Sequence, residues 1–217
     1  MKRILSLLFL LPVSLLAQTS EVGNWMIYFG NKKISDKWNW HHEVQYRNFN
    51  AIGDTEQLLL RTGIGYNLSE NNNNLLFGYG FIYSEPYLGD TDAKTHFNEH
   101  RIYQQFITRQ TTGRVSFQHR YRFEQRFFQD DTRLRLRYFL GITLALNRSQ
   151  LLDHTLYLST YNELFVTTTQ PVFDRNRLYG GLGYRLSKYL RTEIGFMNQR
   201  TSNRSRNQLN LIAFVSF

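Results

Sequence analysis

The chain contains no cysteine and only three prolines among its 217 residues. An exported chain without cysteine has no disulfide scaffold and no cysteine for a lipoprotein anchor. Pro12 lies in an N-terminal apolar segment, and Pro86 and Pro171 lie in predicted loops, where a missing backbone donor does not interrupt a strand ladder. After that segment, no apolar run reaches the roughly 20 residues that a membrane-spanning helix needs. These absences exclude a disulfide scaffold and a membrane-spanning helix in the mature chain.

The N-terminus has the features of a cleavable export signal. Lys2 and Arg3 form a positive beginning, residues 4–16 are apolar, and Ala17 offers a small residue for cleavage before Gln18. This order of features is typical of a secretory signal peptide. We therefore expect a signal peptide over residues 1–17 and a single mature domain over residues 18–217.

Apolar and polar residues alternate with a period of two from Trp38 to Phe217. The clearest rows of outward apolar residues lie in 58–68, 75–83, 134–146 and 209–217. Another row begins at 38–46. Fainter rows lie in about 99–110, 114–128, 155–166, 176–186 and 190–200. Segments of this length are typical of a transmembrane, antiparallel up-and-down β-barrel in the outer membrane of Gram-negative bacteria. The pattern predicts ten to twelve strands, with outer-membrane lipid as the surroundings.

Two other classes compete with this interpretation. A secreted β-sandwich also alternates, but its strands are shorter and its turns recur every 8–12 residues. The formal net charge of +9 is compatible with nucleic-acid binding, but the arginines are interleaved singly within strands rather than clustered on an arm or helix. We expect no nucleic-acid partner and favour an arginine-rich barrel interior.

The number of strands is left open by the N-terminal segment Gly23–Asn31. Ten strands follow from residue 38 onward, whereas single-chain bacterial barrels have even strand numbers. The eleventh segment would thread the lumen, close the barrel in an unusual way, or indicate a missed strand. A last strand ending in Phe217 resembles the signal read by the barrel assembly machinery, which is the expected partner. We expect a monomer with its C-terminus in the periplasm and with its longest loops, Pro86–Phe97 and Thr167–Arg175, outside.

Charges on neighbouring strands suggest a register for one hairpin. A turn at Thr112–Gly113 would place Arg101 opposite Glu124 and Glu99 opposite Arg126, and opposite charges across strands stabilise by roughly 0.2–1 kcal/mol. Arg135 or Arg137 would approach Glu124 from the next strand. The sequence therefore predicts a lumenal ion-pair ladder, which consists of Glu99, Arg101, Glu124, Arg126, Arg135 and Arg137.

The predicted inward positions hold more arginines than acids. They include Glu43, Glu99, Glu124, Glu163 and Glu193, and Arg47, Arg61, Arg101, Arg120, Arg122, Arg126, Arg135, Arg137, Arg185 and Arg191. The ladder would either fill and stiffen a small barrel or form an anion-preferring, porin-like passage, since arginine forks bind carboxylate and phosphate.

Four glycines form a second expected lumenal feature. With a turn at Asn71–Asn72, Gly65 would face Gly78 and Gly63 would face Gly80, which leaves a bare patch inside the barrel. This patch would serve barrel curvature or make room for the N-terminal segment or a ligand.

No catalytic or metal-binding constellation stands out. His96 and His100 have the spacing of helical zinc ligands, but they lie at a loop-to-strand junction. A membrane-embedded hydrolase, the alternative function, would need His96 or His119 within about 2.6–3.2 Å of Ser, Asp or Glu on a neighbouring strand. A further alternative is an extracellular binder that uses Tyr87, Phe97 and Phe173 at its loops. We expect no enzymatic activity, no catalytic residue, no cofactor and no metal.

Longer motifs carry a resemblance to a known family. Trp25 near the N-terminus is followed by EHRIYQQF at Glu99–Phe106, HRYRFEQRF at His119–Phe127 and NRLYGGLGYRLS at Asn176–Ser187. With these motifs the chain resembles the outer-membrane family catalogued as domain of unknown function 2490, over nearly the whole mature chain. The resemblance implies a membrane β-barrel in the cell envelope and supplies no activity. The expected role is a structural or narrow transport element.

Overall fold

The computed structural model describes residues 22–69 and 72–217, and these residues form eleven β-strands. The strands are β1 (Gly23–Lys33), β2 (Trp38–Asn48), β3 (Thr55–Asn67), β4 (Asn73–Ser84), β5 (Phe97–Thr112), β6 (Val115–Phe127), β7 (Thr132–Ala145), β8 (Thr155–Thr167), β9 (Phe173–Arg185), β10 (Leu190–Arg200) and β11 (Ser205–Ser216). The expected signal peptide, residues 1–17, lies outside the described residues. No helix in the described part of the chain is long and apolar enough to cross a membrane.

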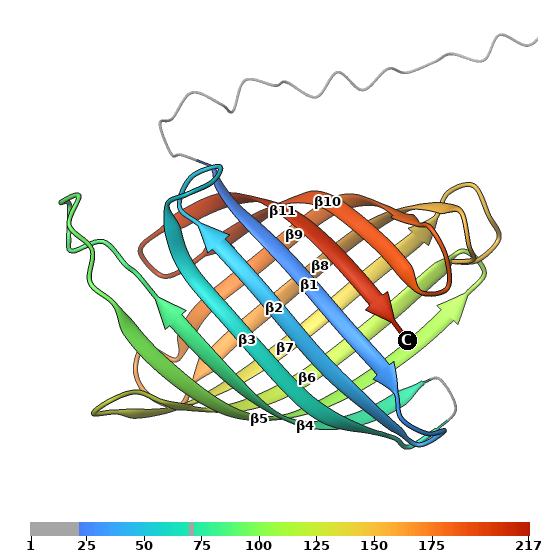
Figure 1. Ribbon diagram of the computed structural model, residues 1–217, viewed down its shortest axis with the longest axis horizontal. Helices are drawn as coiled ribbons and strands as arrows, with labels where there is room; N and C mark the ends of the chain where they lie inside the picture. Colours follow the sequence, from blue (N-terminus) through green and yellow to red (C-terminus); the bar gives the residue numbers. More distant parts are fainter. Residues whose placement is uncertain (1–21, 70–71) are drawn as a thin grey trace, which may run out of the picture.

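The eleven strands close into one barrel of tilted strands (Figure 1). Each strand from β1 to β10 pairs antiparallel with the next strand in sequence. The barrel closes where β1 pairs with β11 in parallel, from Gly23 beside Gln208 to Asn31 beside Ser216. A closed meander with an odd number of strands must bring its first and last strands together in the same direction. The segment Gly23–Asn31 therefore closes the barrel wall, and this resolves the open strand number at eleven. Closure also leaves no strand edge unpaired.

The turns divide between two ends of the barrel. One end, the loop end, carries residues 49–54, 85–96, 128–131, 168–172 and 201–204 together with the start of β1, and the other end carries the remaining turns and the end of β11. The segment 85–96 is the longest connection at the loop end, as expected. The expectation for Thr167–Arg175 is wrong, because Phe173–Arg175 already belong to β9, and the connection 146–154 at the opposite end is longer than 168–172.

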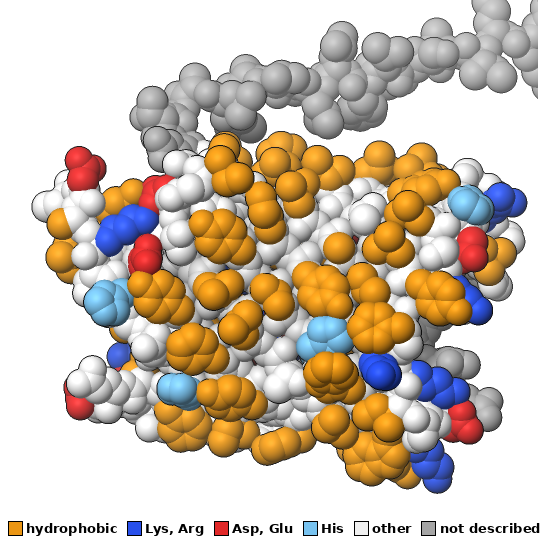
Figure 2. Space-filling view, in the orientation of Figure 1, with side chains coloured by type: hydrophobic (Ala, Val, Ile, Leu, Met, Phe, Trp, Pro, Cys, Tyr) orange, Lys and Arg blue, Asp and Glu red, His pale blue; other side chains and the backbone are white. Residues whose placement is uncertain are grey.

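The two faces of the strands carry opposite chemistry. Large apolar side chains point outward, with Phe77 61% and Phe196 63% exposed, whereas Glu99 and Glu124 point inward and are at most 1% exposed. Figure 2 shows apolar side chains across the middle of the outer surface, with most charged side chains gathered near the two ends. Water-soluble proteins rarely expose such a continuous apolar surface. The barrel is therefore inside-out relative to a water-soluble fold.

Candidate functional site

A buried network of arginines and carboxylates lines the inner surface along β5 to β9. This arginine–glutamate network comprises Glu99, Arg101, Arg120, Arg122, Glu124, Arg126, Arg135, Arg137, Glu163 and Asp174, and its ion pairs form two groups, Glu99 with Arg101 and Arg126, and the other seven residues. It includes all six residues of the predicted ladder. Alternation places most of these side chains inside, because residues two apart on a strand share one face, and Asp174 joins them at the register shift between β8 and β9.

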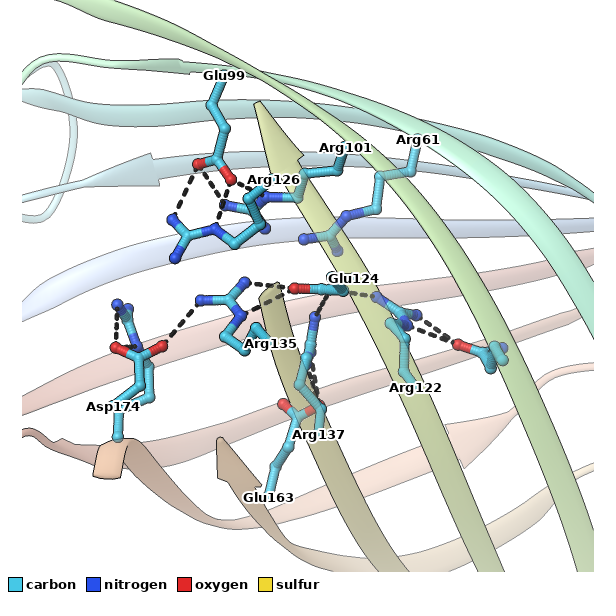
Figure 3. A network of polar contacts seen from close by, with 12 residues as sticks. Arg61, Glu99, Arg101, Arg122, Glu124, Arg126, Arg135, Arg137, Glu163 and Asp174 are labelled. Atoms are coloured by element: carbon cyan, nitrogen blue, oxygen red, sulfur yellow. Dashed lines mark hydrogen bonds and ion pairs between the residues drawn. The ribbon is translucent and has the colours of Figure 1, made fainter. Parts of the chain in front are cut away.

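Glu124 is the centre of the network (Figure 3). Its Oε2 accepts hydrogen bonds from Nη2 of Arg135 at 2.6 Å and Nε of Arg135 at 2.9 Å, and its Oε1 accepts from Nη1 of Arg137 at 2.6 Å. Arg122 approaches the same Oε1 at 3.5 Å. Because Arg137 also donates to Glu163 at 2.5 Å, one guanidinium joins two carboxylates. The contacts tie β6, β7 and β8 together, so both Arg135 and Arg137 approach Glu124.

Glu99 forms a second centre toward the loop end. Arg101 donates to it through Nε and Nη2, at 2.5 and 2.7 Å, and Arg126 donates through the same pair of atoms at 2.6 and 3.1 Å. Both contacts are two-pronged forks, the strongest arrangement of these groups. The predicted contact of Glu99 with Arg126 is confirmed, whereas Arg101 pairs with Glu99 and not with Glu124.

The predicted register of the β5–β6 hairpin is wrong by two residues. Arg101 lies opposite Arg126, and Tyr103 lies opposite Glu124, because the turn consists of Gly113 and Arg114. Gly113 has φ +56°, and a two-residue turn that begins with a left-handed residue favours glycine at its first position. Glu99 bridges the facing arginines diagonally, so the turn geometry is satisfied without an unpaired charge.

The predicted glycine patch also needs correction. All four glycines face inward, but Gly63 pairs with Gly78, Gly65 with Leu76, and Gly80 with Arg61. The turn residues 70–71 lie outside the described residues, but Asn67 pairs with Asn74 beside them, which shifts the register by two.

The patch is filled rather than bare. The ring of Tyr103, directly opposite Gly78, occupies the space that a Cβ on Gly78 would need. Asn39 fills the corresponding space at Gly65. Tyr157 lies over Gly183 in the same way. Glycine here allows an aromatic ring to lie flat against the neighbouring strand, as it does in other sheets that pair aromatic residues with glycine.

The opposite side of the lumen holds a hydrophobic cluster beside buried amides. The seam cluster consists of Trp25, Ile27, Tyr179, Met197 and Ile212, and the same strands also bury Asn24, Gln208 and Asn210. They come from β1 and from β9 to β11, so the parallel seam completes this cluster. Glu193 lies beside it and accepts hydrogen bonds from the hydroxyls of Tyr157 at 3.0 Å and Tyr179 at 3.3 Å. Sequence reasoning missed this cluster, because an inward tyrosine has the same polarity as an outward one at a membrane interface.

Buried arginines outnumber buried carboxylates in the described residues. The buried set contains Arg47, Arg61, Arg101, Arg122, Arg135, Arg137 and Arg177, against Glu43, Glu99, Glu124, Glu163 and Glu193. Arg47 donates only to the amides of Gln45 and Gln57, and its guanidinium lies 3.6 Å from the Trp25 ring centre. Sequence reasoning missed Arg177 and Asp174, although the alternation of Tyr179, Gly181 and Gly183 extends back to Arg177.

Three histidines lie against tyrosines across strands on the outer surface. The Nδ1 of His119 lies 2.9 Å from the Tyr138 hydroxyl, and that of His100 lies 2.6 Å from the Tyr79 hydroxyl. His96 packs against the ring of Tyr83. These contacts do not supply the Ser, Asp or Glu that a hydrolase needs. His41 does lie near a carboxylate, with its Nε2 3.7 Å from Glu43 on the same strand. The described residues hold no cluster of three or more metal-ligating side chains. The absence of enzymatic activity stays a prediction.

The aromatic residues expected at the loops have different ring partners. Tyr87 packs against Phe49 with ring centres 4.9 Å apart, and Phe97 packs against Phe128 at 6.2 Å. Phe49 and Phe97 line one pocket at this end of the barrel, whereas Phe173 is already part of β9. An extracellular binder stays an alternative.

The fold and the lumen together define a class: a closed eleven-stranded β-barrel with a charged interior and an apolar outer surface. Within this class, the chain belongs to the family described as protein of unknown function (DUF2490), whose match covers residues 22–210. The resemblance noted in the motifs is thus confirmed. No curated protein and no solved structure matches the chain.

Proposed function

We propose that this protein is an integral outer-membrane β-barrel that acts as a structural element with a closed lumen. Lipid is the surroundings that its outer surface fits, because the exposed side chains of Phe77, Ile194 and Phe196 would otherwise face water. Barrels span membranes because closure satisfies every backbone polar group within the protein. The barrel assembly machinery, acting on β11, is the proposed partner for insertion, and the proposed state is a monomer.

Glu124 carries the structural part of the proposal. It is fully buried at the centre of the lumen, where arginines from β6 and β7 bind it. Tyr103, Tyr157 and Phe165 are also at most 1% exposed, so side chains fill the interior at several levels. A small barrel is just wide enough for such filling. A filled, cross-linked interior suits a rigid barrel better than an open channel.

The excess of buried arginine favours a second candidate, a narrow anion-preferring transport element. Burying a charge without a counter-charge is expensive, so arginines such as Arg47 that bind only amides leave positive charge that an anion in the lumen would offset. A cation would meet net repulsion in the same space.

Single-channel recording from refolded protein in a planar bilayer distinguishes the two candidates. The closed barrel predicts no steady current from the wild type and a current after Glu124→Ala, because this change removes the centre of the network. Arg148→Ala serves as the control, since Arg148 is exposed and lies outside the network. A steady anion-selective current from the wild type that Arg101→Ala alters would contradict the closed barrel and support transport. A cation-selective current would contradict both.

A further inference from the structure

A pocket of about 240 Å³ lies at the loop end of the barrel. Its floor includes Gln57, Ser84 and Gln199, and its rim includes Arg204, Arg206 and Phe97. These residues come from β3, β4, β5, β10, β11 and the β10–β11 connection, so the barrel scaffold holds most of the pocket. The volume is suited to a small molecule rather than to a peptide segment.

The floor presents hydrogen-bond donors because arginines below it take up its acceptors. Arg47 donates to Oε1 of Gln57 at 2.7 Å, and Nε2 of Gln57 donates to Oγ of Ser84 at 2.8 Å. The hydroxyl hydrogen of Ser84 is thereby left for an acceptor in the pocket. Arg177 donates to Oε1 of Gln199 at 2.8 Å. The Nε2 of Gln199 has no acceptor among the described residues, so both of its hydrogens remain available.

The charges around the pocket are positive in sum. Glu56 is the carboxylate at its edge, and Arg206 neutralises it at 2.9 Å. Arg204 is exposed, and its guanidinium forms no ion pair with the described residues. Arg47 and Arg177 add positive charge beneath the floor. A cation would meet a net positive charge, whereas an oxyanion would meet a guanidinium fork and neutral donors.

One side of the pocket is apolar. Phe49, Pro86 and Phe97 line it, and Phe97 is 41% exposed. An inorganic ion would leave this side against water, whereas a ring or short chain attached to the anion would cover it. The donors and the apolar side together define the kind of ligand.

We propose that this pocket binds a small organic oxyanion, a carboxylate or a phosphate monoester that carries an apolar group. The oxyanion lies between Arg204, Ser84 and Gln199, and the apolar group lies against Phe97. This binding role goes beyond a structural barrel and needs only the folded protein, whether or not the lumen conducts.

Isothermal titration calorimetry of the refolded barrel in detergent tests the site. The probes are benzoate, phenyl phosphate, inorganic phosphate and, as the matched cation, benzyltrimethylammonium, all at constant ionic strength. We expect saturable binding of benzoate or phenyl phosphate, weaker binding of inorganic phosphate and none of the cation. Arg204→Gln should weaken the bound anion about tenfold, the loss typical of one charged hydrogen-bonding contact.

Arg200→Gln is the matched control, because Arg200 lies at the same end of the barrel but does not line the pocket. It should leave the affinity unchanged within twofold. Equal losses for the two variants would overturn the site, since they would indicate general charge attraction. Absence of saturable anion binding, or equal binding of the cation, would also overturn it. The calorimetry needs no membrane, so its failure is distinguishable from a failure in the conductance experiment.

Discussion

Glu124 and Glu193 are both buried glutamates on the inner surface, but different groups hold them. Glu124 is bound by the guanidinium groups of Arg135 and Arg137. Glu193 is bound by the hydroxyls of Tyr157 and Tyr179 and lies beside the seam cluster. A carboxylate among arginines is cross-linked by charge, whereas a carboxylate among tyrosines is solvated by neutral groups. The same residue type thus braces one wall through ion pairs and is held by neutral hydroxyl groups in the other.

The largest expected effect comes from Glu124→Gln. Removing one partner of a buried charged group costs about 3–5 kcal/mol, because the arginines stay buried without their counter-charge. Glu193→Gln should cost less, since the amide oxygen still accepts one tyrosine hydrogen bond and the amide NH2 can donate to the other hydroxyl, and no arginine loses its counter-charge. Urea unfolding of the two refolded variants in detergent measures both losses. Equal losses, or a larger loss for Glu193→Gln, would contradict the difference between the walls.

A smaller effect is expected from Tyr157→Phe. The change removes one hydrogen bond to the Glu193 carboxylate and keeps the ring over Gly183, so the loss should be about 1.5–3 kcal/mol. Tyr161→Phe is the matched control, because the Tyr161 hydroxyl contacts only the Met197 sulfur, at 3.2 Å. The same urea titration compares the two variants. If Tyr161→Phe is as destabilising as Tyr157→Phe, the hydroxyls do not act through Glu193.

The smallest effect should come from Asp54, which lies outside the lumen in the β2–β3 connection. Partial burial of the Asp54 carboxyl raises its pKa, but hydrogen bonds from Lys94 and Tyr87 outweigh burial and lower the pKa below its usual 3.8. Because the folded-state pKa is lowered, the contact stabilises the connection 85–96 above about pH 4 and is lost as the pH falls through the lowered pKa. We expect less than about 1 kcal/mol at this largely solvated pair.

Hydrogen exchange of residues 85–96 at pH 7 and pH 3 measures this effect. It is compared as protection, which is the intrinsic rate at each pH divided by the observed rate, because intrinsic amide exchange is itself far slower at pH 3. Protection should fall at the lower pH in the wild type and in Asp92→Asn, an exposed position of the same connection. Asp54→Asn should show the same low protection at both values. Wild-type protection that is unchanged at pH 3 would contradict a role for the Asp54 contact.

The strands could be predicted from the sequence because every second residue in them must be apolar to form the outer surface. The rows at 58–68 and 134–146 correspond to β3 and β7. The same alternation predicts that the six residues of the ion-pair ladder point into the lumen. For this reason all six of them lie in the arginine–glutamate network, although one predicted contact, Arg101 with Glu124, does not form.

The registers could not be predicted from charge alone. Long side chains reach diagonal partners, so Glu99 binds Arg126 in a register two residues from the predicted one. The position of Gly113 in its turn decided that register, and a pair of facing arginines was tolerated. The seam was equally hidden, because nothing in residues 23–31 distinguishes a parallel neighbour from an antiparallel one. Only the count of eleven strands does so.

The parallel seam makes the central claim directly testable: β1 must begin at the loop end, and the loop end must lie across a membrane from the end of β11. Because the chain contains no cysteine, single-cysteine variants report one position each. Labelling with a membrane-impermeant maleimide in intact cells is the measurement we would make. Val22→Cys and Asp92→Cys should be labelled, and Asp36→Cys and Lys188→Cys should react only after permeabilisation. Equal labelling of Val22→Cys and Asp36→Cys in intact cells would contradict a barrel that spans the outer membrane.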